Sequence, residues 1–214
     1  AAAAVCTGGA AVVSDRAQKA KNVQRAFLGA METQMQIGCY PSETGSPADL
    51  TERERTELQT AYTSRVEQYY TEENPCRKRY IALNEDFLTA CDSDVEYSES
   101  GGVADCRFDS VRLYADRMTA VVQAQTLVWD KRISGNPEQG FSVELPVNRD
   151  TITATMKKEN GVWKLDSIDS QISLSAAVPA DDEVCRERYP TFETARQAAD
   201  RIDDQAYIKE ARFA

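Results

Sequence analysis

The sequence of 214 residues has no histidine, no Cys-x-x-Cys pair and no long apolar run. Without histidine, acid–base catalysis by an imidazole and the Ser-His and Cys-His arrangements are excluded. The usual spacings of zinc and haem-attachment sites are absent too, so we expect no metal and no cofactor. No apolar stretch approaches the roughly 20 residues that cross a bilayer, so we expect no membrane span.

Positive charge is also scarce. The chain has 25 Lys and Arg residues against 35 Asp and Glu residues, a net charge of -10. This balance repels the phosphate backbone of nucleic acids and argues against docking on anionic lipid. In the expected N-terminal tail, residues 1–13, Val5 precedes Cys6, which argues against a lipid anchor because the anchored cysteine usually follows a small residue. The expected partner is a protein or a second copy of the chain.

The six cysteines are an even number and lie far apart in the sequence. Disulfides are favoured over buried thiols, which predicts an extracytoplasmic protein, secreted or at the cell surface. Three pairs are candidates: Cys91 with Cys106, Cys39 with Cys76, and Cys6 with Cys185. The first bond would close a loop of about 15 residues, worth roughly 3 kcal/mol. The second would join the ends of the first two helices, and the third would tether the C-terminal segment. The connectivity stays open.

Three amphipathic helices are predicted in the first half of the chain. Between residues 14 and 37 the apolar residues recur at steps of three and four, and Gly38 supplies a stop. Thr51-x-x-Glu54 has the spacing of a capping box, and Asn74-Pro75 ends the second helix. A third helix is expected over residues 76–90.

The stretch from residue 91 to residue 106 is acidic and rich in small residues. Its first acids fit a calcium-binding loop, but Tyr97 stands where the loop needs glycine and Val103 where it needs glutamate. The favoured interpretation is a short strand over residues 95–98 that enters a glycine turn at residues 101–102.

Residues 107–169 organise the rest of the chain, because apolar and polar residues alternate there over long runs. A strand at Val111–Leu113, a turn at Tyr114–Arg117 and a second strand over residues 118–128 predict a hairpin. Asn160-Gly161 is the strongest hairpin signal, because both residues tolerate the positive φ of a type I′ turn. These patterns predict an α+β fold with N-terminal helices packed on a bent antiparallel sheet.

Residues 14–171 are expected to form one domain. A linker is predicted over residues 172–190, where small and charged residues dominate, followed by a C-terminal helix over residues 191–214. The apolar stripe of that helix is thin and rich in alanine. We therefore expect it to pack weakly and to reach a neighbouring molecule.

Helices followed by a bent sheet that ends in the hairpin M-K-K-E-N-G-V-W-K-L resemble the nuclear transport factor 2-like (NTF2-like) cone-fold superfamily, in its extracytoplasmic bacterial type. The resemblance covers residues 14–171 and implies a cone-like sheet around the helices. Similar domains serve mostly as interaction modules. Some members are enzymes that place an Asp or His base and a Tyr or Asp donor in the cavity between sheet and helices.

The favoured function is a non-catalytic protein–protein interaction or scaffold module within a secreted or cell-surface assembly. The alternative is a small-molecule binder or isomerase-like enzyme that uses the cone cavity, with an Asp base and a Tyr donor. Acidic residues at strand ends are usually solvated, and aromatic residues on half-covered elements are usually core, so we assign no catalytic residue. The candidates to line a ligand cavity are Tyr62, Asp109, Tyr114, Trp129, Asp130 and Trp163.

Overall fold

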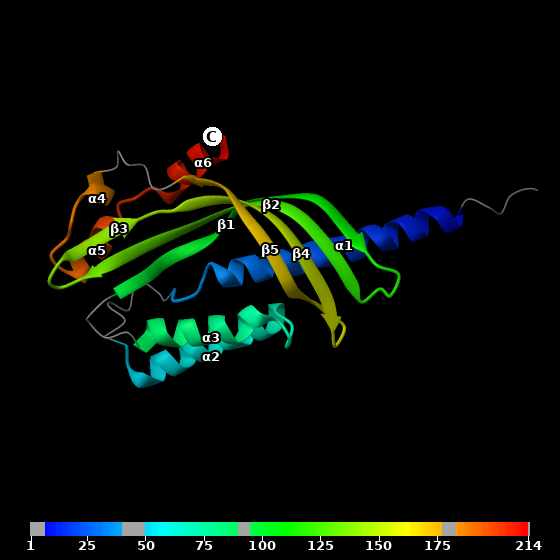
Figure 1. Cartoon of the computed structure of the whole chain (residues 1–214), viewed down its shortest axis with the longest axis horizontal. Helices are drawn as coiled ribbons and strands as arrows, with labels where there is room; N and C mark the ends of the chain where they lie inside the picture. Colours follow the sequence, from blue (N-terminus) through cyan, green and yellow to red (C-terminus); the bar gives the residue numbers. More distant parts are fainter. Residues whose placement is uncertain (1–6, 40–49, 90–94, 177–182, 214) are drawn as a thin grey trace, which may run out of the picture.

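The computed structural model describes residues 7–39, 50–89, 95–176 and 183–213 and has the predicted α+β fold. Figure 1 shows a curved sheet with α2 and α3 beneath it, α1 running along it, and α6 on the opposite side. The elements are α1 Thr7–Gln34, α2 Glu52–Tyr69, α3 Pro75–Thr89, β1 Val95–Leu113, β2 Thr119–Asn136, β3 Gly140–Glu144, β4 Val147–Glu159, β5 Val162–Ala176, α4 Glu183–Arg186, α5 Phe192–Ala199 and α6 Asp204–Phe213.

The sheet is antiparallel, with the strand order β1-β2-β4-β5, and β3 pairs with the end of β2. β4 pairs with β2 from Thr119 to Trp129, and β3 pairs with it from Arg132 to Asn136. Between these two partners, the Asp130 N–H donates to the carbonyl of Pro146 at 3.1 Å. β2 is therefore the strand that joins all parts of the sheet.

The first strand differs from its prediction. The expected short strand and glycine turn form a single strand of 19 residues that runs through Gly101 and Gly102. A Cβ atom on Gly101 would lie 2.7 Å from the carbonyl oxygen of Met35 and 3.0 Å from that of Trp129. The glycine therefore serves close packing of the segment after α1 on the sheet, and no turn occurs here.

The local signals for turns and caps are confirmed. Asn160 and Gly161 have φ values of 50° and 84°, as a type I′ turn requires. The Thr51 N–H donates to the Glu54 carboxylate at 2.8 Å, which completes the predicted capping box of α2. The turn at Tyr114–Arg117 closes with a 3.1 Å bond from the Arg117 N–H to the Tyr114 carbonyl.

The main core lies between the concave face of the sheet and α1 and α2. Phe27 of α1 is fully buried and meets Phe108 of β1 edge-on, with ring centroids 5.8 Å apart. Burying such a side chain contributes roughly 1.5–3 kcal/mol. The other large buried members of this cluster include Val23, Met31, Tyr62, Val66, Tyr70, Val122, Ile152, Met156, Trp163 and Leu165.

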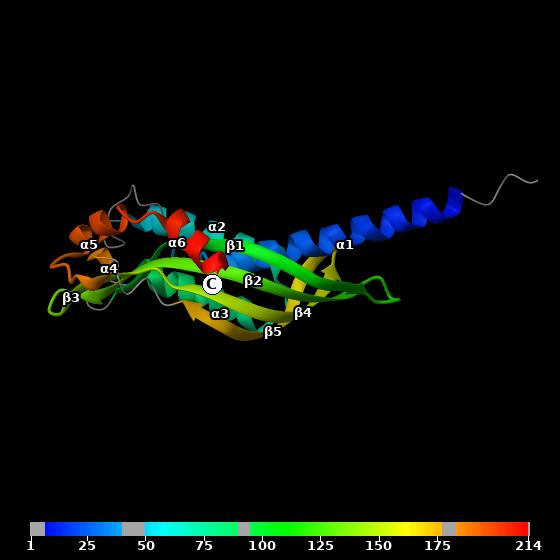
Figure 2. The same cartoon turned by 90° about the horizontal axis from the view of Figure 1, so that it is seen from above.

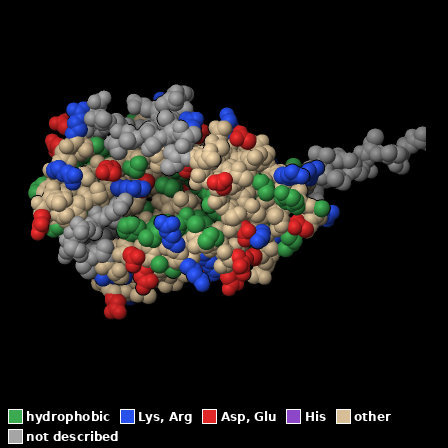
Figure 3. All heavy atoms as spheres, viewed as in Figure 1, with side chains coloured by type: hydrophobic (Ala, Val, Ile, Leu, Met, Phe, Trp, Pro, Cys, Tyr) green, Lys and Arg blue, Asp and Glu red, His purple; other side chains and the backbone are tan. Residues whose placement is uncertain are grey.

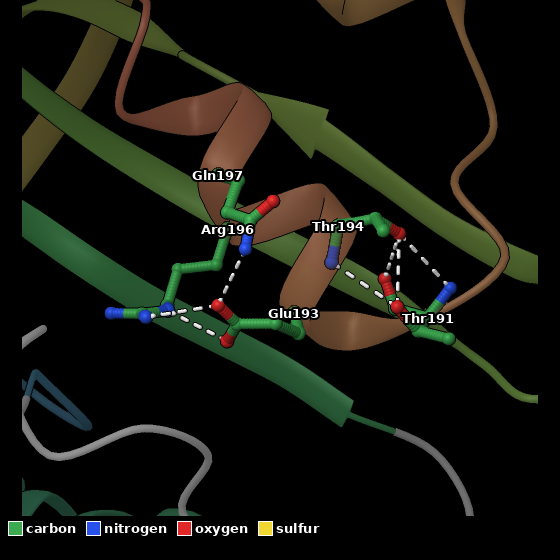
Figure 4. Close-up of polar contacts among 5 residues, drawn as sticks. All are labelled: Thr191, Glu193, Thr194, Arg196 and Gln197. Atoms are coloured by element: carbon green, nitrogen blue, oxygen red, sulfur yellow. Dashed lines mark hydrogen bonds and ion pairs between the residues drawn. The ribbon is translucent and has the colours of Figure 1, made fainter.

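The C-terminal segment forms two helices, α5 and α6, and not the single helix predicted. α5 begins with a capping box in which the Thr194 N–H donates to Thr191 Oγ1 at 3.1 Å. Figure 4 shows this cap and, in the first turn, the Glu193 carboxylate accepting bonds from Arg196 and Gln197. An acid in the first turn also complements the positive end of the helix.

These helices pack closely on their own sheet, whereas the thin apolar stripe predicted weak packing. Ala195 and Ala199 are fully buried against the outer face of β2 and β3, because their small side chains permit close approach. Tyr189 exchanges two backbone hydrogen bonds of 2.8 Å with Phe141 of β3. The predicted linker is likewise partly sheet, since β5 extends to Ala176.

A buried ion-pair network also holds the C-terminal helices. Lys131, on the outer face of β2, is 7% exposed. Its ammonium pairs with Glu99 of β1 and Asp204 of α6, each at 3.3 Å, and donates to the Ala199 carbonyl at 3.4 Å. Burial raises the pKa of Glu99, and the attraction of Lys131 opposes this shift. The network therefore depends on the lysine to compensate two carboxylates.

We predict that Gly101→Ala destabilises the protein by about 1–3 kcal/mol, because the new methyl group meets two backbone carbonyls that cannot rotate away. The matched control is Gly102→Ala, whose Cβ would meet the flexible Glu32 carboxylate at 3.1 Å. Urea unfolding of both variants measures the difference. Equal midpoints for the two variants would contradict the packing argument.

We also predict that Lys131→Met destabilises the fold by about 3 kcal/mol, because Glu99 and Asp204 lose their buried counter-charge. The control is Lys157→Met. Lys157 pairs with Asp166 at 2.9 Å but its side chain is 50% exposed, so its loss is expected to cost less than about 1 kcal/mol. Thermal unfolding compares the two variants, and an equal loss in both would show that burial of the network contributes nothing.

Candidate functional site

The deep part of the space between the sheet and the helices is filled by side chains. The Tyr62 hydroxyl donates to the Thr33 carbonyl at 3.2 Å, and the Tyr70 hydroxyl donates to the Ala30 carbonyl at 2.7 Å. Burial raises the pKa of both tyrosines, so both hydroxyls stay protonated. Tyr62 is therefore a core residue that ties α2 to α1, and it is no ligand-facing donor.

An open cavity of about 430 Å³ lies nearer the surface, and we call it the mouth cavity. Figure 3 shows a hollow between α3 and the sheet, with hydrophobic side chains on its walls. The cavity combines an apolar wall from α1, its following turn and α3 with a polar wall from β1 and β2. Its lining residues are Gln34, Met35, Ile37, Arg79, Tyr80, Leu83, Phe87, Ser98, Asp130 and Arg132.

The register of β1 with β2 brings the residues of the polar wall together. Ser98 of β1 lies directly opposite Arg132 of β2, and Asp130 stands two positions before Arg132 on the same face of β2. The Ser98 hydroxyl and the Arg132 guanidinium both donate to the Asp130 carboxylate. Asp130 is only 6% exposed. Its charge is thus compensated inside the wall, and no tyrosine hydrogen bond to it occurs among the described residues.

The other predicted cavity residues do not meet at this site. Asp109 pairs with Arg107 at 3.3 Å on the exposed face of β1. Trp129 packs on the opposite face of the sheet, against the C-terminal helices and Leu127. Tyr114 and Trp163 line a separate concavity of about 420 Å³ at the hairpin end of the sheet. The expected Asp–Tyr pair is therefore not assembled, and only Asp130 lines the mouth cavity.

Arg132 and Ser98 were not predicted as cavity residues. The place of Arg132 could be predicted from the sequence, because alternation along β2 puts it on the same face as Asp130. The place of Ser98 could not, because it depends on a bulge between Ser98 and Ser100 in the pairing of β1 with β2. Within the described ranges, no group of three or more acidic or cysteine side chains is arranged to hold a metal ion.

The predicted Cys39–Cys76 bond is not formed, and both thiols are free. The Gly38 N–H donates to Asn84 at 3.0 Å, so the end of α1 lies against the second half of α3. Cys76 lies at the opposite end of α3, about 12 Å away along the helix. A disulfide needs Cα atoms within about 7 Å, which this arrangement excludes.

Cys106 also carries a free thiol and packs against the main core. Its predicted partner Cys91 lies outside the described residues, as does Cys6, the predicted partner of Cys185. Burial raises the pKa of Cys106 from 9.0 to about 11, with a smaller contribution from Asp105. Burial likewise raises the pKa of Cys39, beside Ser98 and Asp130, to about 11. Both are therefore thiols and not thiolates at neutral pH.

No protein-family model matches the sequence, and no curated protein is a significant match. Among solved structures, the crystal structure of the intermembrane space region of the chloroplast protein ARC6 is similar, at 14% sequence identity and a TM-score of 0.45, over 73% of this chain and 97% of that chain. A likeness at this level carries no functional argument. Within the described residues, no helix is long and apolar enough to cross a membrane.

The two partly buried thiols, of Cys39 and Cys106, predict a pH dependence. Their folded-state pKa values lie above the ordinary value, so their contribution to stability is complete below about pH 9 and is lost as the pH rises toward 11. We expect the urea midpoint of the reduced wild type to fall more steeply between pH 8 and pH 10 than that of Cys39→Ala/Cys106→Ala, since lysines and tyrosines titrate in both. Parallel profiles would contradict the buried position of the thiols.

Proposed function

We propose that the protein is a non-catalytic contact module of an extracytoplasmic assembly, secreted or at the cell surface, and that a protein partner inserts an apolar side chain into the mouth cavity. One observation carries this proposal. The cavity is open and has an apolar wall from α1 and α3, and the buried acid of its polar wall, Asp130, already pairs with Arg132 and accepts a hydrogen bond from Ser98. Such a site can accept an apolar side chain, but it offers no acid–base pair for catalysis.

The lining of the mouth cavity has the character of a protein interaction hot spot. Leu83 and Phe87 of α3 supply a partly buried apolar surface, and the exposed Arg79 stands on the same helix. Interaction hot spots are pockets that accept an aromatic or aliphatic anchor and exclude water around it. Arginine at the rim favours a partner that carries a carboxylate or carbonyl beside its anchor.

Two parts of this proposal rest on the sequence. The NTF2-like relationship is supported by helices that precede a curved antiparallel sheet and by its last hairpin at Asn160-Gly161. The oxidising compartment is supported by the even number of cysteines, of which Cys6 and Cys91 lie outside the described residues. Mass spectrometry of the native protein before and after reduction and alkylation tests the compartment, since a protein with six free thiols would contradict it.

A small molecule is the second candidate occupant of the mouth cavity. Its volume of about 430 Å³ falls within the range of ligand sites in proteins. The lining favours a mostly apolar ligand with one anionic or carbonyl group near Arg79 or Arg132. An isomerase reaction is not supported, because Asp130 is engaged by Arg132 and the Tyr62 hydroxyl by Thr33.

The test places a photoreactive phenylalanine analogue at Leu83, on the cavity wall, in the full chain within its own cells. We expect irradiation to join this variant to one discrete protein, because the partner's anchor lies against Leu83 in the complex. The matched control carries the analogue at Ala82, which is exposed on the same helix and does not line the cavity.

The outcomes separate the candidates. A protein adduct from position 83 and not from position 82 supports the contact module, including an adduct with a second copy of the chain. A small-molecule adduct, seen as a discrete mass increase of the purified protein, would replace the proposal with the ligand-binding alternative. Equal adducts from both positions, or none from either, would contradict the proposal.

A further inference from the structure

The end of the molecule that carries the β1–β2 and β4–β5 hairpins has a second concavity, of about 420 Å³, beside the N-terminal half of α1. Four of its lining residues are cations, Arg16, Lys19, Arg117 and Lys158, and none is acidic. We call it the cationic concavity. It shares no lining residue with the mouth cavity.

Apolar side chains are exposed around the same concavity. Tyr114, Met118 and Val162 are the exposed large hydrophobic residues of the described part of the chain, at 44%, 48% and 51% exposure. Two belong to the β1–β2 turn, and Val162 follows the β4–β5 turn. Exposed apolar residues gathered at one place indicate an interaction site, whereas scattered ones do not.

The charge at this end is opposite to that of the whole chain. The net charge of -10 argued against anionic lipid, but that sum says nothing about distribution. Among the acids at this end, Asp116 accepts hydrogen bonds from the N–H groups of Met118 and Thr119, which lower the pKa of its carboxyl and keep it charged, and Glu159 pairs with Lys164 at 3.3 Å. Arg112 adds a further cation over the Tyr114 ring, 5.5 Å from its centroid. The hairpin end is therefore locally cationic on an acidic molecule.

The order of uncharged and charged residues along α1 points to a lipid surface as the partner. Figures 1 and 2 show α1 extending past both hairpins at this end. The part that extends begins with residues 7–13, which include no charged residue; Asp15 follows, and then Arg16 and Lys19 stand at the level of the concavity. An uncharged helix end suits the interior of a bilayer, and cations with aromatic residues suit its headgroup layer. The acidic body of the protein then lies on the aqueous side.

We propose that this end docks on an anionic lipid bilayer. The cationic concavity receives lipid phosphate groups, and Tyr114, Met118 and Val162 enter the boundary between headgroups and acyl chains. An acidic protein surface would satisfy the cations as well, but it would not require an uncharged helix to project beyond them. This inference goes beyond the proposed function and does not depend on it, because docking leaves the mouth cavity untouched.

The experiment is flotation of the full chain with vesicles of phosphatidylcholine alone, or of phosphatidylcholine with about 30 mol% phosphatidylglycerol. We expect flotation with the anionic vesicles only, and a loss of binding as NaCl rises from about 50 mM to about 500 mM, because salt screens the attraction. No flotation with the anionic vesicles, or equal flotation with both kinds, would overturn the proposal.

Two pairs of substitutions with the same change in net charge give the matched control. Arg16→Glu/Arg117→Glu reverses the charge at the concavity, and we expect it to weaken binding at least about tenfold. Arg53→Glu/Arg188→Glu changes two exposed cations elsewhere, and we expect little effect. Equal losses in the two pairs would reduce the binding to a net-charge effect and overturn the site. Unfolding midpoints confirm that both variants fold.

The apolar contribution and the rival partner are tested separately. We expect Met118→Ser/Val162→Ser to weaken vesicle binding severalfold, because both side chains are exposed in the free protein; unchanged binding would overturn the insertion. A photoreactive residue at position 118 that captures a protein, with capture lost in Arg16→Glu/Arg117→Glu and no vesicle binding, would assign the surface to an acidic protein and overturn the lipid proposal. Cross-linking at position 83 reports on the mouth cavity independently.

Discussion

The burial of both faces of β2 is the constraint on which the rest of the structure depends. Residues on its concave face, such as Val122, lie in the core with α1 and α2, and residues on its outer face, such as Ile133, lie in a second core with α5. A strand covered on one side needs a simple alternation of apolar and polar residues. In its second half, from Leu127 to Ile133, β2 needs apolar or compensated residues at nearly every position, and Asp130 and Lys131 are the compensated ones, each paired toward its own face.

The sequence predicted the local features of the structure better than the contacts that bury the two faces of β2. The capping box at Thr51 and the hairpin at Asn160-Gly161 depend on residues close in sequence, so pattern reasoning found them. Gly101 and Gly102 predict a turn by residue type alone, but Gly101 permits the close approach of the segment after α1, which is distant in sequence. The sequence showed that both faces of β2 carry apolar residues, but it did not show which residue belongs to which core.

The candidate sites show the same limit. Asp130 was identified as an acid at a strand end, but its partners Ser98 and Arg132 come together only through the register of β1 with β2. Tyr114 and Trp163 were grouped with it as cavity residues, yet they line another concavity, because hairpin ends lie far along the strands from the cavity mouth. Residue type made these side chains candidates to line a ligand cavity. Strand register determined which of them lie together.

The pairing of Tyr189 with Phe141 has a consequence for synthesis of the chain. Until the C-terminal segment emerges from the ribosome, the outer edge of β3 has unpaired backbone groups and its apolar face is uncovered. Lys131 and its acceptor Ala199 are 68 positions apart, so the nascent sheet waits for several dozen residues before it is closed. An unpaired apolar edge is a template for aggregation, and the C-terminal helices act as a late intramolecular cover that removes it.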